Sequence, residues 1–159
     1  MSAIVQVLSL ITLRLAQAAI LGTLAIVSYE VIARYVFNSP TQSSLEVTEY
    51  FLVAMGFLSL AAISSAKGHV AVDLLTSQLS IAWQRVCQVL VLLITAIFAS
   101  IVTWFGVDMT WHAYVSQTVS SSLLSFPMWI AYLSIPLGFF ALALESIAQL
   151  LELPIRESR

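Results

Sequence analysis

The sequence predicts an all-α integral membrane protein with four transmembrane helices and a short interfacial amphipathic helix between spans two and three. Apolar residues make up 60% of the 159 residues and charged residues only 9%, whereas a soluble domain carries about a quarter charged residues. The mean hydropathy is +1.00. The apolar residues also fall into four runs, each close to the roughly 20 residues that cross a bilayer as a helix. We therefore expect a single four-span membrane domain over residues 1–159.

The composition also excludes several classes of function. A net charge of -2 carried by few groups gives neither a basic surface for nucleic acid nor an acidic tail. Cys87 is the only cysteine, so neither an internal disulfide nor a CxxC metal or redox site is available. The sequence contains no catalytic-serine, zinc-protease or phosphate-loop motif. We expect no nucleic acid partner, no catalytic residues, no metal site and no cofactor in this chain.

The first span is expected over residues 14–37. An apolar run at residues 4–13 precedes it, and no basic residue comes before Arg14. A cleavable signal peptide begins with a basic region, so we expect this run to remain in the mature protein. Asn38 and Pro40 are typical of a helix end, and they stop the first span.

The second span is expected over residues 46–66. Ser43, with Glu46 three residues later, has the pattern of a capping box at a helix start. Because the break before it is short, spans one and two should form a helical hairpin. Lys67 marks the end of the second span, where its charge complements the helix dipole.

Residues 70–84 are expected to form the interfacial helix. Apolar and polar residues recur there at helical spacing on two different faces, the apolar ones being Val72, Leu75 and Leu79 and the polar ones Asp73, Ser77, Ser80 and Gln84. A helix of this kind, too short to span, lies in the membrane interface. Leu74 and Ile81 blur the pattern, so an ordinary loop is the alternative. In either case Lys67, His69 and Asp73 mark a change of chain direction.

The third and fourth spans are expected over residues 86–107 and 127–150. A connection rich in Ser, Thr and Gln separates them, and Pro127 suits the first turn of the last helix. Pro136 lies inside that helix and removes one backbone hydrogen bond. With Gly138 close by, we expect a kink at Pro136.

The basic residues predict the orientation, because short loops rich in Lys and Arg stay in the cytoplasm. Only Arg34 falls at one face of the membrane, and the other five fall at the opposite face: Arg14, Lys67, Arg85, Arg156 and Arg159. Both termini should therefore be cytoplasmic.

Ionisable residues inside apolar spans are candidate site residues, because such groups are costly in lipid and usually face protein or water. Glu30 and Arg34 are four residues apart on one helix face, which predicts an ion pair. Glu30 is then either a proton- or ion-coupling carboxylate or part of a pair that locks span one to a neighbour. Arg34 favours the second interpretation because it stabilises the charged carboxylate. Near the inner end of span four, Glu145 is expected to meet Arg14 or Lys67.

Three further side chains are candidates at the ends of the spans. Glu46 and Glu49 lie in the first turn of span two, where acids are favoured by the helix dipole. Glu49 is expected either to reach Arg34 across the hairpin or to present its carboxylate to a partner. His69 suits an interface anchor or a hydrogen bond better than a metal ligand, because no cysteine or second histidine lies near it. His112 falls at the opposite membrane face, so the two histidines cannot bracket one haem.

Four segments in this order carry a resemblance to a known family: "VIARYVFNSP", "LEVTEYF", "KGHVAVDLL" and "SSLLSFPMWIAYLSIPLGFF". Together with four spans they resemble the small membrane subunit, the DctQ type, of tripartite ATP-independent periplasmic (TRAP) transporters. In that family two adjacent acids and an Arg often start span two. Here the acids are Glu46 and Glu49, and Glu49 stands about where that Arg would be.

The resemblance implies a subunit of the bacterial inner membrane that takes part in importing an organic acid with sodium. Its partners would be the lipid bilayer, a large multi-span subunit and an extracytoplasmic substrate-binding protein. The large subunit would hold the sodium and substrate sites and move like an elevator, while the small subunit braces it and helps to dock the binding protein. Two alternatives stay open: a self-sufficient four-span proton-coupled exporter that uses Glu30, and an accessory subunit of another membrane complex.

Overall fold

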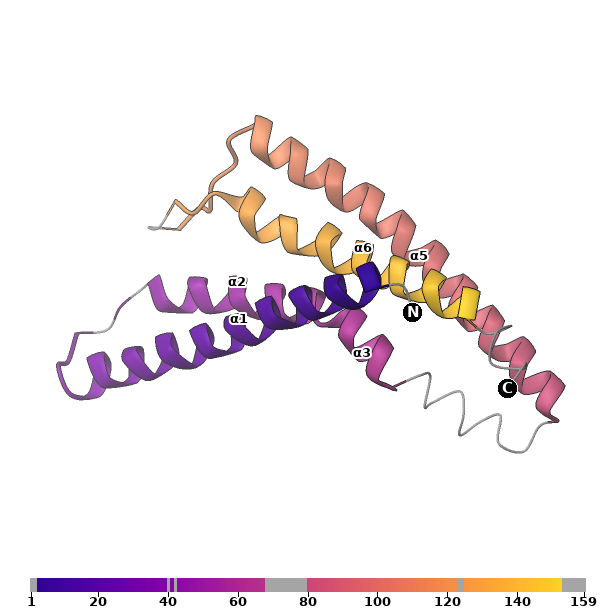
Figure 1. Cartoon of the computed structure of the whole chain (residues 1–159). Coiled ribbons are helices and arrows are strands. Elements are labelled where there is room, and N and C mark those ends of the chain that lie inside the picture. The colour runs from indigo at the N-terminus through magenta and orange to yellow at the C-terminus, as the bar shows by residue number, and fades with distance from the viewer. Residues whose placement is uncertain (1–2, 40, 42, 68–79, 123–124, 153–159) are drawn as a thin grey trace.

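The computed structural model describes residues 3–39, 41, 43–67, 80–122 and 125–152. Almost all of them are helical (Figure 1). The helices are α1 (Ala3–Tyr35), α2 (Ser43–Leu58), α3 (Leu60–Lys67), α5 (Ile81–Val115) and α6 (Met128–Glu152).

Four stretches of the described chain are long and apolar enough to cross a membrane: Val5–Tyr35, Ser44–Ser65, Trp83–Val115 and Met128–Glu152. The second of these contains both α2 and α3. The predicted fold class, an all-α protein with four candidate transmembrane spans, is confirmed. The last span agrees with the predicted range within two residues at each end.

Two helices are longer than predicted. α1 begins at Ala3 instead of residue 14, and α5 runs from Ile81 to Val115 instead of over 86–107. Residues 4–13 contain neither Gly nor Pro, so nothing stops the helix before Arg14, and Arg is itself a good helix former. At 33 and 35 residues, α1 and α5 are each about 50 Å long. This exceeds the roughly 30 Å hydrocarbon core, so both helices must tilt in a bilayer or extend beyond it.

Most of the predicted interfacial helix lies outside the described residues, namely residues 70–79, which include Asp73. His69 lies outside them as well. Ser80 is the N-cap of α5, with extended backbone angles of φ -62° and ψ 151°. The amide of Gln84 already donates to the Ser80 carbonyl at 3.0 Å. Residues 81–84 therefore belong to α5 and not to a separate interfacial segment.

The break in helical structure lies in span two, where the sequence predicted one continuous helix. Ser59 separates α2 from α3, and its hydroxyl donates to the carbonyl of Gly56 at 3.2 Å. Serine hydroxyls that bond back to a preceding carbonyl compete with the helix and often bend it. In contrast, α6 continues as one helix through Pro136, and the predicted kink at this position stays a prediction.

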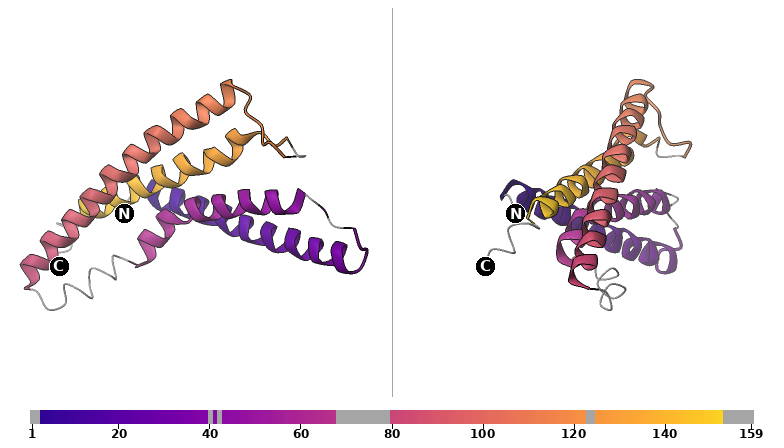
Figure 2. Two further views of the ribbon diagram at one scale, coloured as in Figure 1. Left: turned by 180° about the vertical axis from the view of Figure 1, so that it is seen from behind. Right: turned by 90° about the vertical axis from the view of Figure 1, so that its right-hand side faces the viewer.

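The helices form two antiparallel hairpins that meet at one end and splay apart toward the other (Figures 1 and 2). We call the end with the start of α1 and the end of α6 the terminal end, and the end with residues 36–42 and 116–127 the loop end. α6 packs against α5, α2, α3 and α1, whereas α5 packs chiefly against α6. Over the 18-residue apolar stretch compared in each span, 44% of α6 is buried, against 11–17% of the other three. α6 is therefore the central helix.

Candidate functional site

At the loop end, Glu30 joins α1 to the start of α2. One carboxylate oxygen of Glu30 accepts from Arg34 at 3.0 Å, so the predicted ion pair is present. The other accepts from the Thr41 amide at 3.2 Å and the Ser44 hydroxyl at 2.5 Å, and it also contacts the Thr41 hydroxyl. The side chain of Glu30 is only 14% exposed, compared with 54% for Arg34. Both carboxylate oxygens of Glu30 thus accept hydrogen bonds from neighbouring groups. These bonds join α1 to α2 and close the hairpin.

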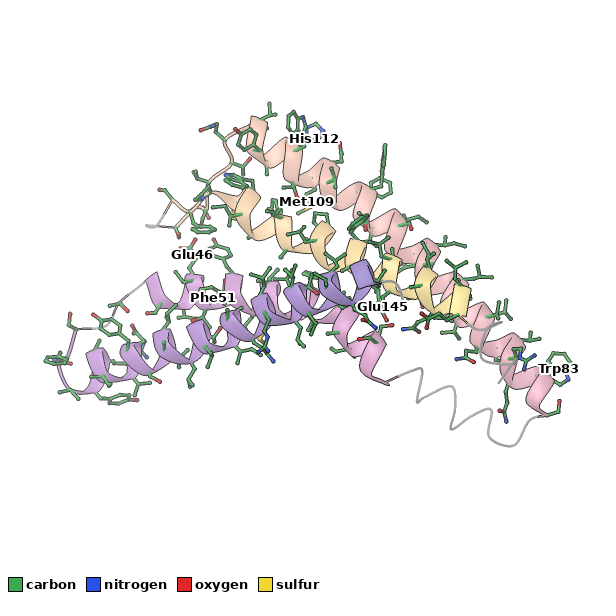
Figure 3. All side chains as sticks on the ribbon, in the orientation of Figure 1. Glu46, Phe51, Trp83, Met109, His112 and Glu145 are labelled. Carbon is green, nitrogen blue, oxygen red and sulfur yellow. The ribbon has the colours of Figure 1, made fainter. Side chains whose placement is uncertain are left out.

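Glu46 links α2 to the segment between α5 and α6. Its carboxylate accepts from the Tyr50 hydroxyl at 2.6 Å and also contacts the Ser122 hydroxyl. The ring of Tyr50 stacks on that of Phe126, with centroids 4.6 Å apart. Figure 3 shows Glu46 between the start of α2 and this connection. Glu46 lies in the first turn of α2, as predicted, and its oxygens also bond to the side chains of Tyr50 and Ser122.

The connection itself has an ordered backbone at its ends. Val119 and Pro127 form an isolated antiparallel bridge, and the amide of Met128 donates to the Thr118 carbonyl at 3.0 Å. Ser120 donates its amide to the Phe126 carbonyl at 2.9 Å. These bonds hold Ser122 and Phe126 where α2 can reach them, so the two hairpins are linked at the loop end despite their splay.

Glu49 is exposed and has no hydrogen bond or ion pair among the described residues. Arg34 bonds to Glu30 instead, so the expected contact between Arg34 and Glu49 does not form. A carboxylate presented to a partner is the remaining expectation for Glu49. Lys67 ends α3, but its side chain lies outside the described residues.

At the terminal end, Glu145 joins three helices. It is fully buried, and it accepts from the hydroxyl of Ser9 on α1 at 3.2 Å and from the amide of Gln149 at 3.1 Å. Gln149 also donates to the carbonyl of Ser64 on α3, at 3.4 Å. We call Ser9, Ser64, Glu145 and Gln149 the Glu145 cluster, which lies where α1, α3 and α6 meet (Figure 3).

The expected pair between Glu145 and Arg14 is not formed. Arg14 is exposed and donates to Gln17 at 3.2 Å. It follows Ser9 by five residues, which places the two side chains roughly 140° apart around the helix. Because Ser9 faces α6, Arg14 points away from it. The sequence offered one signal for the true arrangement: Gln149 follows Glu145 at the i, i+4 spacing that puts two side chains on one face.

Pro136 and Gly138 lie where α6 crosses its neighbours. A Cβ atom on Gly106 of α5 would lie 3.1 Å from Cδ of Pro136, and a Cβ on Gly138 would lie 2.1 Å from the Phe57 carbonyl oxygen of α2. Real Cβ atoms do not come that close to backbone, so the absence of a side chain at 138 is what permits this crossing. Pro136 is thus a packing residue of the central helix.

The described residues show no group of three or more His, Cys, Asp and Glu side chains that could hold a metal ion. His112 lies at the loop end of α5 (Figure 3), 3.5 Å from Asp108. Both of these side chains are exposed, at 74% and 62%. The charged side chains described above thus connect helices or face outward.

Comparison with known proteins shows the family of this chain. Residues 23–154 match the family model of the DctQ component of tripartite ATP-independent periplasmic transporters. The chain is also 32% identical over 87 residues to the C4-dicarboxylate TRAP transporter small permease protein DctQ of Rhodobacter capsulatus. That alignment covers 52% of this chain and 38% of the relative, so the matched part spans well under half of the relative's length. No solved structure matches.

The family match covers most of the chain, including the Glu30 and Glu46 contacts at the loop end and the whole of α5 and α6. Its members are transporter components and not enzymes. The chain belongs to the family of DctQ components, the small permease subunits of TRAP transporters.

Proposed function

We propose that this subunit serves a sodium-coupled importer of an organic acid in the bacterial inner membrane, with both of its termini in the cytoplasm. It braces a large multi-span subunit, which holds the substrate and sodium sites, and helps to dock an extracytoplasmic substrate-binding protein. The observation that carries the proposal is the family match over residues 23–154. The relative from Rhodobacter capsulatus is named for C4-dicarboxylates, which makes these acids the first substrates to test.

The internal contacts support the role of a brace. Glu30 ties α1 to α2, Glu46 ties α2 to the connection before α6, and Glu145 ties α6 to α1. Transporter sites built from broken helices occur in corresponding positions of two repeats. Among the described spans only the second is divided, at Ser59. A chain whose ionisable groups connect its own helices is suited to stay rigid while a partner moves.

The outward surfaces support contact with other molecules. Large apolar side chains point outward along α5, including those of Phe98, Trp104 and Phe105. They offer an apolar face to lipid or to the large subunit. At the loop end, exposed Glu49 and the Ser-rich connection are polar groups that a soluble binding protein can reach.

The test is to tag the C-terminus in the native cell, solubilise the membranes gently and identify what co-purifies. We expect one much larger multi-span membrane protein in stoichiometric amount, and uptake of an organic acid that requires sodium when the pair is reconstituted with the binding protein. Recovery as a self-associated oligomer alone, with proton-driven efflux of drugs that Glu30→Gln abolishes, would contradict the proposal and support the exporter.

A further inference from the structure

A groove of about 360 Å³ lies between α1 and α2 at the loop end. Its lining is divided by chemistry. Apolar surface comes from Val27, Val31, Tyr35 and Leu45, charges of opposite sign come from Glu30 and Arg34, and hydroxyl groups come from Ser44 and Thr48. All four apolar side chains are exposed. The groove therefore opens to the outer surface of α1 and α2, where lipid or a partner protein can enter it.

The cationic end of the groove is only partly engaged. Among the described contacts of Arg34, one terminal nitrogen donates to Glu30, while the guanidinium carries five N–H donors in a planar fork. Its side chain is 54% exposed. Glu30 is itself fixed by Thr41 and Ser44, so the guanidinium is held in place with donors to spare. This is the geometry that binds a phosphate oxygen pair well.

The apolar part continues from Arg34 toward the middle of the span. Arg34, Val31 and Val27 are separated by three and four residues, so they form one strip along a single face of α1. Arg34 lies in the last turn of the helix, at the end of the span. A ligand that follows this strip needs an anionic group at the level of the span's end and a hydrocarbon chain directed into the bilayer.

We propose that this groove, the Arg34 groove, is a binding site for one glycerophospholipid. The phosphodiester accepts hydrogen bonds from the Arg34 guanidinium, and one acyl chain lies along Val31 and Val27. A small soluble anion would leave the apolar strip unused, and an alkyl chain without a phosphate would leave the guanidinium donors unused. The site is independent of the proposed transport function, because it depends only on α1 and α2.

The test is native mass spectrometry of the full chain, purified in detergent, delipidated and titrated with three probes. They are phosphatidylglycerol, diacylglycerol with the same acyl chains, and inorganic phosphate. We expect one preferred site for phosphatidylglycerol and affinities at least about tenfold weaker for the other two probes, as expected when one of two contact types is lost. Arg34→Gln should weaken phosphatidylglycerol binding by about tenfold, since it removes charge-assisted hydrogen bonds.

Two matched controls distinguish changes in the groove from general effects of losing a positive charge or adding a bulky side chain. Arg14→Gln removes the same charge from the other end of α1, and Ile32→Trp places a bulky side chain at an exposed neighbouring position that does not line the groove. Both should bind phosphatidylglycerol like the native chain. Val31→Trp, which fills the groove but keeps the pair between Glu30 and Arg34, should lose the preferred site even if Arg34→Gln misfolds.

Four results would overturn the proposal. The first is native-like phosphatidylglycerol binding by Val31→Trp, and the second is equal weakening by Arg14→Gln and Arg34→Gln. The third is inorganic phosphate binding at Arg34 as tightly as the phospholipid, which would assign the groove to a soluble anion. Loss of the bound phospholipid when the large membrane subunit is present would also contradict the proposal, because it would assign the groove to that protein.

Discussion

The acidic side chains of this chain differ in how fully neighbouring groups satisfy their oxygens. Glu30 receives bonds from Arg34, Thr41 and Ser44, and Glu145 receives them from Ser9 and Gln149. Away from water such bonds replace hydration, and a buried polar group without them is costly. Glu30 and Glu145 therefore hold helices together, whereas exposed Glu49 is available to other molecules.

Replacing Glu145 should lower the stability of the protein, and the loss should be larger when the new side chain keeps fewer of its hydrogen bonds. Glu145→Leu leaves the Ser9 hydroxyl without its acceptor and should lower the free energy of unfolding by about 1–3 kcal/mol. Glu145→Gln keeps an acceptor oxygen and should cost less. Thermal unfolding in detergent measures both, with Glu49→Leu as an exposed control that should change little. If Glu145→Leu proves as stable as Glu49→Leu, the Glu145 cluster does not hold the three helices.

Replacing Glu30 should not change how transport depends on pH. A carboxylate bonded to Arg34, Thr41 and Ser44 is a structural group, so in the complete transporter Glu30→Gln should lower the amount of assembled protein more than the rate per assembled complex. Uptake of an organic acid into vesicles, measured across a range of pH and normalised to the assembled complex, gives the comparison. A pH profile altered by Glu30→Gln would instead identify Glu30 as a coupling carboxylate.

At the scale of helices, small residues decide how closely α6 approaches its neighbours. Helices in lipid associate by close packing, and residues without bulky side chains permit it. Gly138 packs directly on the backbone of Phe57, and Gly106 makes room for Pro136. The buried surface of α6 also carries Ala141, Ala143 and Ala148. The central position of α6 thus follows from its small residues.

Gly138 of α6 and Gly56 of α2 make a matched pair for substitution, because only Gly138 lies in a close contact between the two helices. A methyl group at 138 would overlap the Phe57 carbonyl, whereas nothing lies within 4 Å of a methyl at 56. Gly138→Ala should therefore lower the free energy of unfolding by about 1–3 kcal/mol through overpacking. Gly56→Ala should be neutral or stabilising by up to about 1 kcal/mol, because Ala is the better helix former. Equal melting temperatures for the two variants would contradict the close crossing at Gly138.

The helices themselves could be predicted from the sequence much better than the contacts between them. Hydropathy located all four spans and the pair of Glu30 with Arg34 followed from spacing, because both depend on local sequence. The break at Ser59 could not be predicted, since serine is common in membrane helices and its back-bond to Gly56 depends on local geometry. The partners of Glu145 were missed because only the packing of α1 against α6 brings Ser9, 136 residues away, to it.

At the scale of the whole molecule, Trp83 and Trp129 lie toward opposite ends of the spans. Trp83 is in the first turn of α5 at the terminal end, and Trp129 packs edge-to-face on Tyr114 at the loop end, with centroids 5.7 Å apart. Tryptophan and tyrosine are enriched at both interfaces of a membrane. The splayed hairpins can therefore cross the bilayer with α5 tilted, and the two named ends would face opposite sides.

The positive charges predict which of these two ends faces the cytoplasm. Arg14 and Arg85 lie toward the terminal end and Arg34 at the loop end, so the excess of positive charge predicts that the terminal end faces the cytoplasm. A chain with Cys87→Ser has no native thiol, and single cysteines can then be placed at exposed Ser39, Ser80 and Ser116. In spheroplasts a membrane-impermeant maleimide should label Ser39→Cys and Ser116→Cys at once, and Ser80→Cys only after permeabilisation. The opposite pattern would place both termini outside, and labelling of Ser39→Cys and Ser116→Cys from different sides would contradict the pairing of the two hairpins.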